Sequence, residues 1–147
     1  MLEFDDHYFM EMAYNQALLA EEEGEIPVGA IVVCNGKVIA KAYNQTEVLN
    51  DVTAHAEILA ITAAEQYLGS KYLKDCTMYV TIEPCTMCAG ALYWAQLGGL
   101  FYGASDPKRG FTQFTPLSTH PKTLIRKGIM EEECGELIHK FFKKLRT

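Results

Sequence analysis

The sequence lacks the long apolar runs that a membrane protein needs. No stretch approaches the roughly 18 consecutive apolar residues of a membrane span, so we expect no membrane association. Repeats, low-complexity segments and Pro- or Ser-rich linkers are also missing, and 147 residues suffice for one core, which predicts a single domain over 1–147. The start at 1–6 is acidic, whereas a secretory signal begins basic and continues apolar, so we expect a cytoplasmic protein.

Basic residues are scarce in the first part of the chain. Residues 1–36 contain eight acids and neither Lys nor Arg, and the net charge of the whole chain is −6. This balance is not typical of a nucleic-acid-binding protein. The C-terminal end is different, because it carries Lys140, Lys143, Lys144 and Arg146 with no acid among them. Salt screens charges beyond about 10 Å, so a local basic surface of this kind can still bind a polyanion.

The five cysteines do not form the pattern of a disulfide framework. Their number is odd and no export signal precedes them, which favours a metal-binding or catalytic use for some of them. Cys85 and Cys88 are the only closely spaced pair. Cys34, Cys76 and Cys134 have apolar neighbours, and we expect them to be small buried hydrophobic residues.

The apolar periodicity alternates between helices and strands. The expected helices span 5–23, 54–67, 85–96 and 131–145, and the expected strands span 28–33, 38–42, 77–82 and 97–102. Asn35-Gly36 predicts a hairpin turn between the first two strands. We expect Gly24 to end the first helix, Thr53 to cap the second, and Gly103 to end the last strand before a loop over 103–123. This order predicts a layered α/β sandwich around one sheet.

Two short motifs carry candidate chemistry. His55 and Glu57 stand near one predicted helix start, and Cys85 and Cys88 stand near another. Cysteines at i and i+3 share a helix face, and a helix N-terminus favours the thiolates that bind metal. One nitrogen and two sulfur ligands with an open fourth position are typical of a catalytic zinc, whose bound water loses a proton near neutral pH. Glu57 is then placed to move protons.

Each motif alone has a simpler explanation. A single Cys-x-x-Cys is more often a structural zinc or redox motif, and a single His-x-Glu usually has no function. Together, with Pro84 before the first cysteine and a strand between the two helices, they favour the catalytic interpretation. The combination is the known signature of zinc-dependent nucleobase deaminases.

Over nearly its whole length the sequence resembles the cytidine-deaminase superfamily and, within it, the bacterial tRNA-specific adenosine deaminases. Asn44 stands eleven residues before His55, at the spacing of the family's base-contacting asparagine. The other matching segments are Glu25–Ala30, Thr53–Glu57, Glu83–Ala91, Tyr102–Gly110, Glu133–Cys134 and Phe141–Arg146. After Gly110, the family's run of small residues is replaced by Phe111–Pro116.

The resemblance implies a fold, a reaction and a set of residue roles. The fold is a three-layer α/β/α sandwich around a mixed sheet of about five strands, in a homodimer. The reaction is conversion of adenosine to inosine at the wobble position of the tRNA anticodon loop, by attack of a zinc-bound hydroxide on C6. The implied roles are zinc binding, one Zn²⁺ per chain, by His55, Cys85 and Cys88; proton transfer by Glu57; base contacts by Asn44 and Ala56; packing near the anticodon loop by Phe141; and phosphate contacts by Lys108, Lys143, Lys144 and Arg146.

Two alternatives remain open at this point. Tyr93–Ala95 also resembles bacterial guanine deaminases, which share the zinc motifs, so a free base or nucleoside is a second candidate substrate. A zinc-stabilised binding module without activity is a third possibility, against which the open coordination position and Glu57 both count. The basic C-terminal helix favours RNA, because a neutral free base needs no phosphate contacts.

Overall fold

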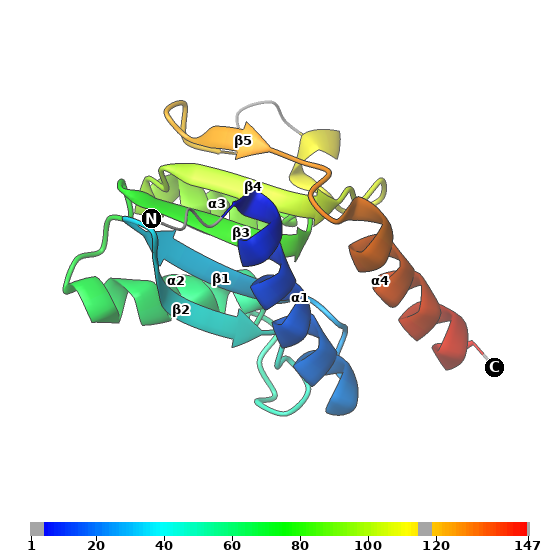
Figure 1. Ribbon diagram of the computed structural model, residues 1–147. Helices are drawn as coiled ribbons and strands as arrows, with labels where there is room; N and C mark the ends of the chain where they lie inside the picture. Colours follow the sequence, from blue (N-terminus) through cyan, green and yellow to red (C-terminus); the bar gives the residue numbers. More distant parts are fainter. Residues whose placement is uncertain (1–4, 115–118, 147) are drawn as a thin grey trace.

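The computed structural model describes residues 5–114 and 119–146. Figure 1 shows the elements in this part of the chain, which alternate between helices and strands. In chain order they are α1 (Asp6–Glu22), β1 (Gly29–Cys34), β2 (Lys37–Tyr43), α2 (Ala56–Leu68), β3 (Cys76–Ile82), α3 (Thr86–Ala95), β4 (Gly99–Ala104), a 3-10 turn η1 (Phe111–Gln113), β5 (Leu124–Arg126) and α4 (Glu131–Leu145). None of these helices has the length and apolar content to cross a membrane.

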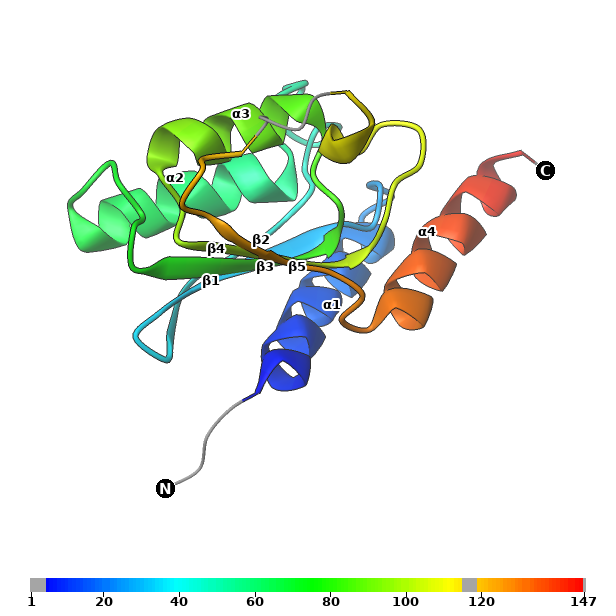
Figure 2. The same ribbon diagram turned by 90° about the horizontal axis from the view of Figure 1, so that it is seen from above.

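The strands form one mixed sheet in the order β2-β1-β3-β4-β5. β1 pairs antiparallel with β2 and β3, whereas β3–β4 and β4–β5 are parallel. Figure 2 shows α2 and α3 on one face of this sheet and α1 and α4 on the other. The predicted three-layer sandwich around a mixed five-stranded sheet is therefore confirmed.

The hairpin between β1 and β2 has the turn that the sequence predicts. Asn35 and Gly36 both adopt left-handed backbone conformations, with φ of 52° and 77°. Positive φ at both central residues is typical of a type I′ turn, whose twist matches that of the flanking strands. Cys34 and Lys37 pair across this turn, so the register of the hairpin is fixed at its closed end.

Each face of the sheet has its own apolar core. The core under α2 and α3 includes Ala60, Met78 and Leu92, and the core under α1 includes Met10 and Ile31. Both lie between a helix layer and alternate side chains of the strands, as expected where each helix has one apolar stripe. This packing fixes α2 and α3 against β3, the arrangement on which the candidate site depends.

The cysteines outside the Cys85–Cys88 pair differ in burial. Cys76 and Cys134 are buried, as predicted, with 1% of each residue exposed. Cys34 is only half-buried at the end of β1, so for this residue the prediction of a buried hydrophobe is wrong. Its position next to an exposed turn explains the difference, because the turn covers only part of the side chain.

Two predictions between residues 97 and 126 are wrong. β4 does not end before Gly103 but continues through it, and Ala104 still pairs with Ile82 of β3. A side chain at position 103 would lie 2.7 Å from the Thr81 carbonyl oxygen, so glycine here permits close packing and does not end the strand. The predicted loop over 103–123 contains η1, residues 115–118 of it lie outside the described residues, and the short strand β5 that follows was not predicted.

Candidate active site

The candidate site lies where the N-termini of α2 and α3 meet. His55 is the N-cap residue of α2, Cys85 is the N-cap residue of α3, and both have extended backbone conformations. Neither side chain caps its helix within the described part of the chain, so both are available for other contacts. Thr53, the predicted cap, instead donates through its amide and hydroxyl to Asp51 Oδ1 at 2.8 and 2.7 Å, so that prediction is wrong.

His55, Cys85 and Cys88 bring three metal-binding atoms together. His55 Nδ1 lies 3.7 Å from Cys85 Sγ and 3.5 Å from Cys88 Sγ, and all three donor atoms lie within 4.8 Å of one another. Zinc–sulfur and zinc–nitrogen bonds of about 2.3 and 2.0 Å at tetrahedral angles place such donors about 3.6 Å apart. The donor set and its spacing therefore fit a zinc ion with three protein ligands.

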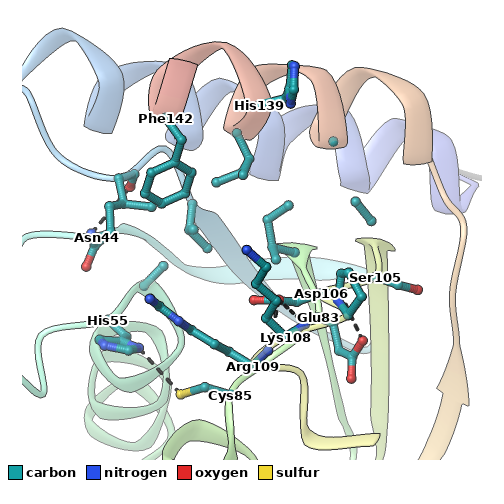
Figure 3. Close-up of a pocket in the computed structure, with 18 of the residues that line it drawn as sticks. Asn44, His55, Glu83, Cys85, Ser105, Asp106, Lys108, Arg109, His139 and Phe142 are labelled. Carbon is teal, nitrogen blue, oxygen red and sulfur yellow. Dashed lines mark hydrogen bonds between the residues drawn. The ribbon is translucent and has the colours of Figure 1, made fainter. Parts of the chain in front are cut away.

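The two thiols differ in their tendency to ionise. A hydrogen bond from Cys88, together with one from His55, lowers the pKa of Cys85 to about 4. The same hydrogen bond to Cys85, together with burial, raises the pKa of Cys88. The pKa of His55 is raised in turn, chiefly by its hydrogen bond to Cys85, which Figure 3 marks with a dashed line. The site thus provides a thiolate, the form of cysteine that binds metal.

Glu57 lies in the first turn of α2, next to these donors. It is buried, with 4% of the residue exposed, and burial raises the pKa of its carboxyl group to about 7. Hydrogen bonds to its own amide and to Cys88 act in the opposite direction, because they stabilise the carboxylate. A carboxyl group whose pKa lies near neutral pH can both accept and donate a proton there.

A cavity of about 790 Å³ opens over these residues, a size that accommodates a nucleoside. Asn44, His55, Ala56, Glu57 and Cys85 are among the residues that line it. Asn44 is buried, and its Nδ2 donates to the Ile26 carbonyl oxygen at 3.3 Å. Its Oδ1 is the one buried side-chain oxygen or nitrogen without a hydrogen-bond partner among the described residues. Because Nδ2 must face the Ile26 carbonyl, this unpartnered acceptor is available to a bound molecule.

Four basic side chains are among the residues that line the cavity. Lys108 and Arg109 come from the loop after β4, Lys143 comes from α4, and Arg146 directly follows α4. Figure 3 shows Arg109 extending across the pocket on the side of His55. Two separate segments therefore bring positive charge to one cavity, although the whole chain is acidic.

The predicted contacts on α4 are only partly brought to the cavity. Phe142 lines it, whereas Phe141 and Lys144 do not lie among the lining residues of the described chain. Figure 3 shows the Phe142 ring extending from α4 towards the side of the cavity that holds Asn44. The family motif contains both phenylalanines. Because successive residues of a helix point in different directions, only Phe142 lines the cavity. The residues of α4 and its C-cap that line the cavity recur at intervals of three and four: Gly135, Ile138, His139, Phe142, Lys143 and Arg146.

Glu83, which was not among the predicted site residues, holds the loop that carries Lys108 and Arg109. Its buried carboxylate accepts hydrogen bonds from the Asp106 amide at 3.1 Å and from the amide and hydroxyl of Thr112 at 3.0 and 2.7 Å. The signal for this role is its place directly before Pro84 and the zinc motif, at the end of β3.

A second buried carboxylate holds the loop on the other side of the site. Glu25 is 1% exposed and accepts hydrogen bonds from the amides of Glu47 and Val48 at 3.0 and 2.8 Å. These amides belong to the segment that connects Asn44 to His55. Sequence reasoning noted Glu25 only as part of a family motif, because its partners are more than twenty residues away.

Known proteins with similar sequences and structures are deaminases. Residues 4–146 match the MafB19-like deaminase family. A tRNA-specific adenosine deaminase of Agrobacterium fabrum is 43% identical over 144 residues, which cover 95% of this chain and 95% of the relative. A solved structure of a tRNA:A34 deaminase, which performs A-to-I editing at the wobble position of transfer RNA, is 44% identical. It superposes with a TM-score of 0.83 and covers 88% of this chain and 98% of its own.

A guanine deaminase of Bacillus subtilis is also similar, with 40% identity and a TM-score of 0.67. That match covers 69% of this chain and 66% of the guanine deaminase, less of both chains than the match to the tRNA:A34 deaminase. The chain therefore belongs to the MafB19-like deaminase family and, within it, to the tRNA-specific adenosine deaminases.

Proposed function

We propose that this protein hydrolyses the 6-amino group of adenosine at the wobble position of tRNA, which yields inosine and ammonia. The observation that carries this proposal is the convergence of three metal-binding atoms beside the buried Glu57 at a cavity lined in part by basic side chains. The similarity to tRNA-specific adenosine deaminases over 95% of the chain supports the same substrate.

His55, Cys85 and Cys88 would hold one zinc ion per chain. The thiolate favoured at Cys85 and the spacing of the three donor atoms support this assignment. When bound, zinc would supply a nucleophile near neutral pH by lowering the pKa of a coordinated water. The protein contributes two helix N-termini beside these donors, which favour negative charge there.

Glu57 would move the protons of the reaction. Its carboxylate accepts a proton from the attacking water and gives it to the ring nitrogen N1 of adenine. A second proton passes through the same carboxyl group to the departing 6-amino group, which leaves as ammonia. The pKa near 7 suits this exchange, because neither protonation state is strongly favoured at neutral pH.

Asn44 and the start of α2 would orient the base. The unpartnered Asn44 Oδ1 would accept a hydrogen bond from the nucleotide, which also removes the cost of burying that oxygen alone. Ala56 begins α2, where backbone N–H groups have no acceptor within the helix and can bind a polar atom of the base. Phe142, on the opposite wall, offers an aromatic surface to a base that has left its stack.

The basic residues of the cavity lining would contact the phosphates of the anticodon loop. Lys108 and Arg109 belong to the loop after β4, and Lys143 and Arg146 to the end of α4, so they could contact a strand that enters between these two segments. A loop nucleotide is the suitable target, since flipping an unpaired base costs less than flipping a paired one. With tRNA as substrate, we place the protein in the cytoplasm.

An exposed apolar stripe on α3 would form a homodimer interface. Met87 and Trp94 lie seven residues apart on one helix face, with Trp94 77% exposed, and Tyr93 stacks edge-on against Trp94 at 5.5 Å. Exposed aromatic residues in a contiguous patch are typical of protein–protein contacts. The proposed partner is a second copy of the chain, because the family resemblance implies a homodimer.

The substrate is tested by offering several substrates to one preparation. An anticodon stem-loop with adenosine at the wobble position should be converted to inosine, whereas free adenine and adenosine should react slowly. The guanine deaminase alternative, which the similarity to the Bacillus subtilis enzyme supports, expects rapid release of ammonia from free guanine instead. Preference for guanine, or stem-loop binding without turnover, would contradict the proposal. The matched control is the same stem-loop with guanosine at the wobble position.

A further inference from the structure

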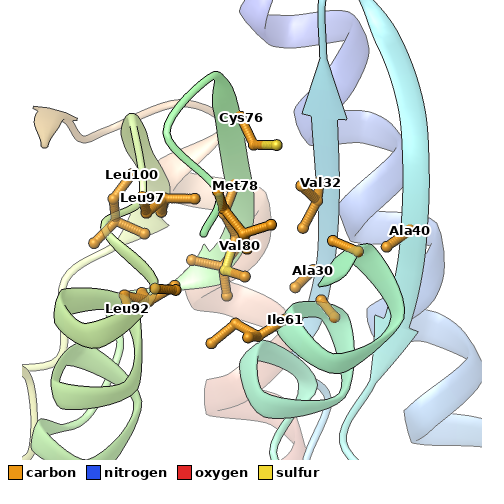
Figure 4. Packing of buried hydrophobic residues seen from close by; sticks show 14 of the residues in the cluster. Ala30, Val32, Ala40, Ile61, Cys76, Met78, Val80, Leu92, Leu97 and Leu100 are labelled. Carbon is orange, nitrogen blue, oxygen red and sulfur yellow. The ribbon is translucent and has the colours of Figure 1, made fainter. Parts of the chain in front are cut away.

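A pair of cysteines lies at the end of the sheet remote from the candidate site. Cys34 is the last residue of β1, Cys76 is the first residue of β3, and the two are direct partners in the antiparallel register. Val32 and Met78 form the partner pair two residues away, and all four side chains belong to the core under α2 and α3. Figure 4 shows Cys76 directed towards β1 from the β3 side. Both thiols therefore lie on the same face of the sheet.

The two thiols are opposed across the strand pair and differ in exposure. Burial, together with the neighbouring Cys34 thiol, raises the pKa of Cys76 to about 12. Cys76 is 1% exposed, whereas Cys34 is half-buried beside the exposed Asn35-Gly36 turn. An oxidant dissolved in water therefore meets Cys34 first, with Cys76 as the adjacent sulfur.

The register satisfies the geometric requirement for a disulfide. Directly opposed residues of an antiparallel pair have Cα atoms about 4.5 or 5.5 Å apart, and disulfides join Cα atoms about 4.4–6.8 Å apart. The Cα separation of either kind of antiparallel pair therefore falls within the range that a disulfide joins. We propose that Cys34 and Cys76 are an oxidation site, at which a peroxide converts the two thiols into an intramolecular disulfide.

The chemistry requires only one equivalent of a hydroperoxide. The Cys34 sulfur attacks a peroxide oxygen to give a sulfenic acid, and one water is released from hydrogen peroxide. The Cys76 sulfur then displaces the hydroxyl group from Cys34, its proton leaves with that group as a second water, and the S–S bond forms. Two thiols have lost two electrons and two protons, and the peroxide has been reduced to two waters.

The disulfide would stabilise the fold and leave the candidate site in place. It closes a loop of about 40 residues that contains Asn44, His55 and Glu57, which restricts the unfolded chain. The cavity is lined by Val28, just before β1, and by Ile82, the last residue of β3. These positions are at the opposite ends of the same two strands, so formation of the bond does not reposition the cavity wall.

The test is oxidation of the folded, metal-loaded protein with hydrogen peroxide. We expect the intact mass to fall by about 2 Da, the mass of the two hydrogens that are lost, and a tryptic peptide pair joined through Cys34 and Cys76. The melting temperature should rise by about 5–10 °C, a shift that a reductant reverses. Deamination by the oxidised protein should continue at a similar rate.

Three variants separate this site from the other thiols. Cys34→Ser and Cys76→Ala should each abolish the cross-link and the rise in melting temperature, whereas Cys134→Ala should retain both. If alkylation finds Cys34 and Cys76 still reduced after oxidation, or Cys34 oxidised to a sulfinic acid without a cross-link, the proposal is wrong. Formation of the cross-link only in urea would also overturn it, because the folded register would then not be responsible.

Discussion

Replacement of Asn44 by leucine should affect activity and stability in opposite directions. The buried Asn44 Oδ1 has no partner among the described residues, and Nδ2 makes one hydrogen bond, to the Ile26 carbonyl oxygen. Leucine has nearly the same size and removes both polar atoms. If Oδ1 awaits the substrate, the free protein loses little from the change, while the bound nucleotide loses a contact.

The expected change in the free energy of unfolding follows from the two polar atoms. Burying an unsatisfied oxygen costs about 1–3 kcal/mol, and the Nδ2 hydrogen bond contributes about 1 kcal/mol. The Ile26 carbonyl keeps a partner after the substitution, because it also accepts from the Val28 amide at 2.8 Å. Asn44→Leu should therefore stabilise the protein by about 0–2 kcal/mol, a rise of at most about 8 °C in melting temperature for a chain of this size.

The expected loss of activity follows from the missing contact with the base. One hydrogen bond to a buried partner is equivalent to about 1–3 kcal/mol, so kcat/KM for the wobble stem-loop should fall about 5- to 150-fold. Gln45→Leu is the matched control, since its half-buried side chain is not among the residues that line the cavity. Calorimetry and a single-turnover assay for inosine measure the two effects on the same preparations.

Three results would refute this reasoning. A fall of several degrees in the melting temperature of Asn44→Leu would mean that Oδ1 is already satisfied in the free protein. Unchanged kcat/KM would mean that Asn44 does not contact the reacting nucleotide. A loss of activity equal to that of Gln45→Leu would assign the effect to the segment as a whole and not to the amide oxygen.

Three further predictions address the metal, the proton carrier and the substrate. Removing the metal with a chelator should abolish deamination and lower the melting temperature, and zinc should restore both in the parent protein but not in Cys85→Ala; elemental analysis checks the metal content. Glu57→Gln should keep zinc and the fold but lose at least about a hundredfold in kcat, and near-normal turnover would assign proton transfer to another group. The affinity for the stem-loop should fall as the salt concentration rises. Lys143→Ala and Arg146→Ala should each reduce the slope of log affinity against log salt by about 0.7–0.9. An unchanged slope would place these side chains away from the phosphates.

Much of the fold could be predicted because its signals are local. The Asn35-Gly36 turn needs two left-handed residues, and the sequence offers a suitable pair between two β-branched runs. α1 ends just before Gly24, as the end of the apolar stripe predicts, and Gly24 adopts a φ of 77°. Turns and helix ends depend on neighbouring residues, so a single sequence carries most of the information about them.

The elements that were missed depend on distant partners. β5 is three exposed residues, Leu124–Arg126, and is a strand only because β4 offers it a free edge. Gly103 resembles a strand end in the sequence, but its missing side chain allows close approach by the Thr81 carbonyl and Cys134 Sγ. No local pattern separates a glycine that ends a strand from one that lets a helix pack closely.

The three candidate zinc donors could be predicted as a set, but their setting could not. The spacing of Cys85 and Cys88 and the His-x-Glu motif were sufficient to choose the residues. The sequence placed Thr53 as the cap of α2, whereas the structure gives the N-cap positions to His55 and Cys85. Which residue occupies the N-cap depends on where the chain enters the helix, and that entry is set by packing against the sheet.

The two buried carboxylates explain how loops can form a defined pocket. Glu25 stands shortly before β1, and Glu83 stands directly after β3. Because these neighbouring strands are antiparallel, both residues lie at the same end of the strands. Each carboxylate is stable there because it accepts two or more hydrogen bonds from the backbone of a loop. The loop bound to Glu25 leads from Asn44 to His55. The loop bound to Glu83 carries Lys108 and Arg109, which line the cavity. The ends of β1 and β3 thereby fix both loops that form the walls of the cavity. Rigid strand ends position groups that loops alone would leave poorly defined.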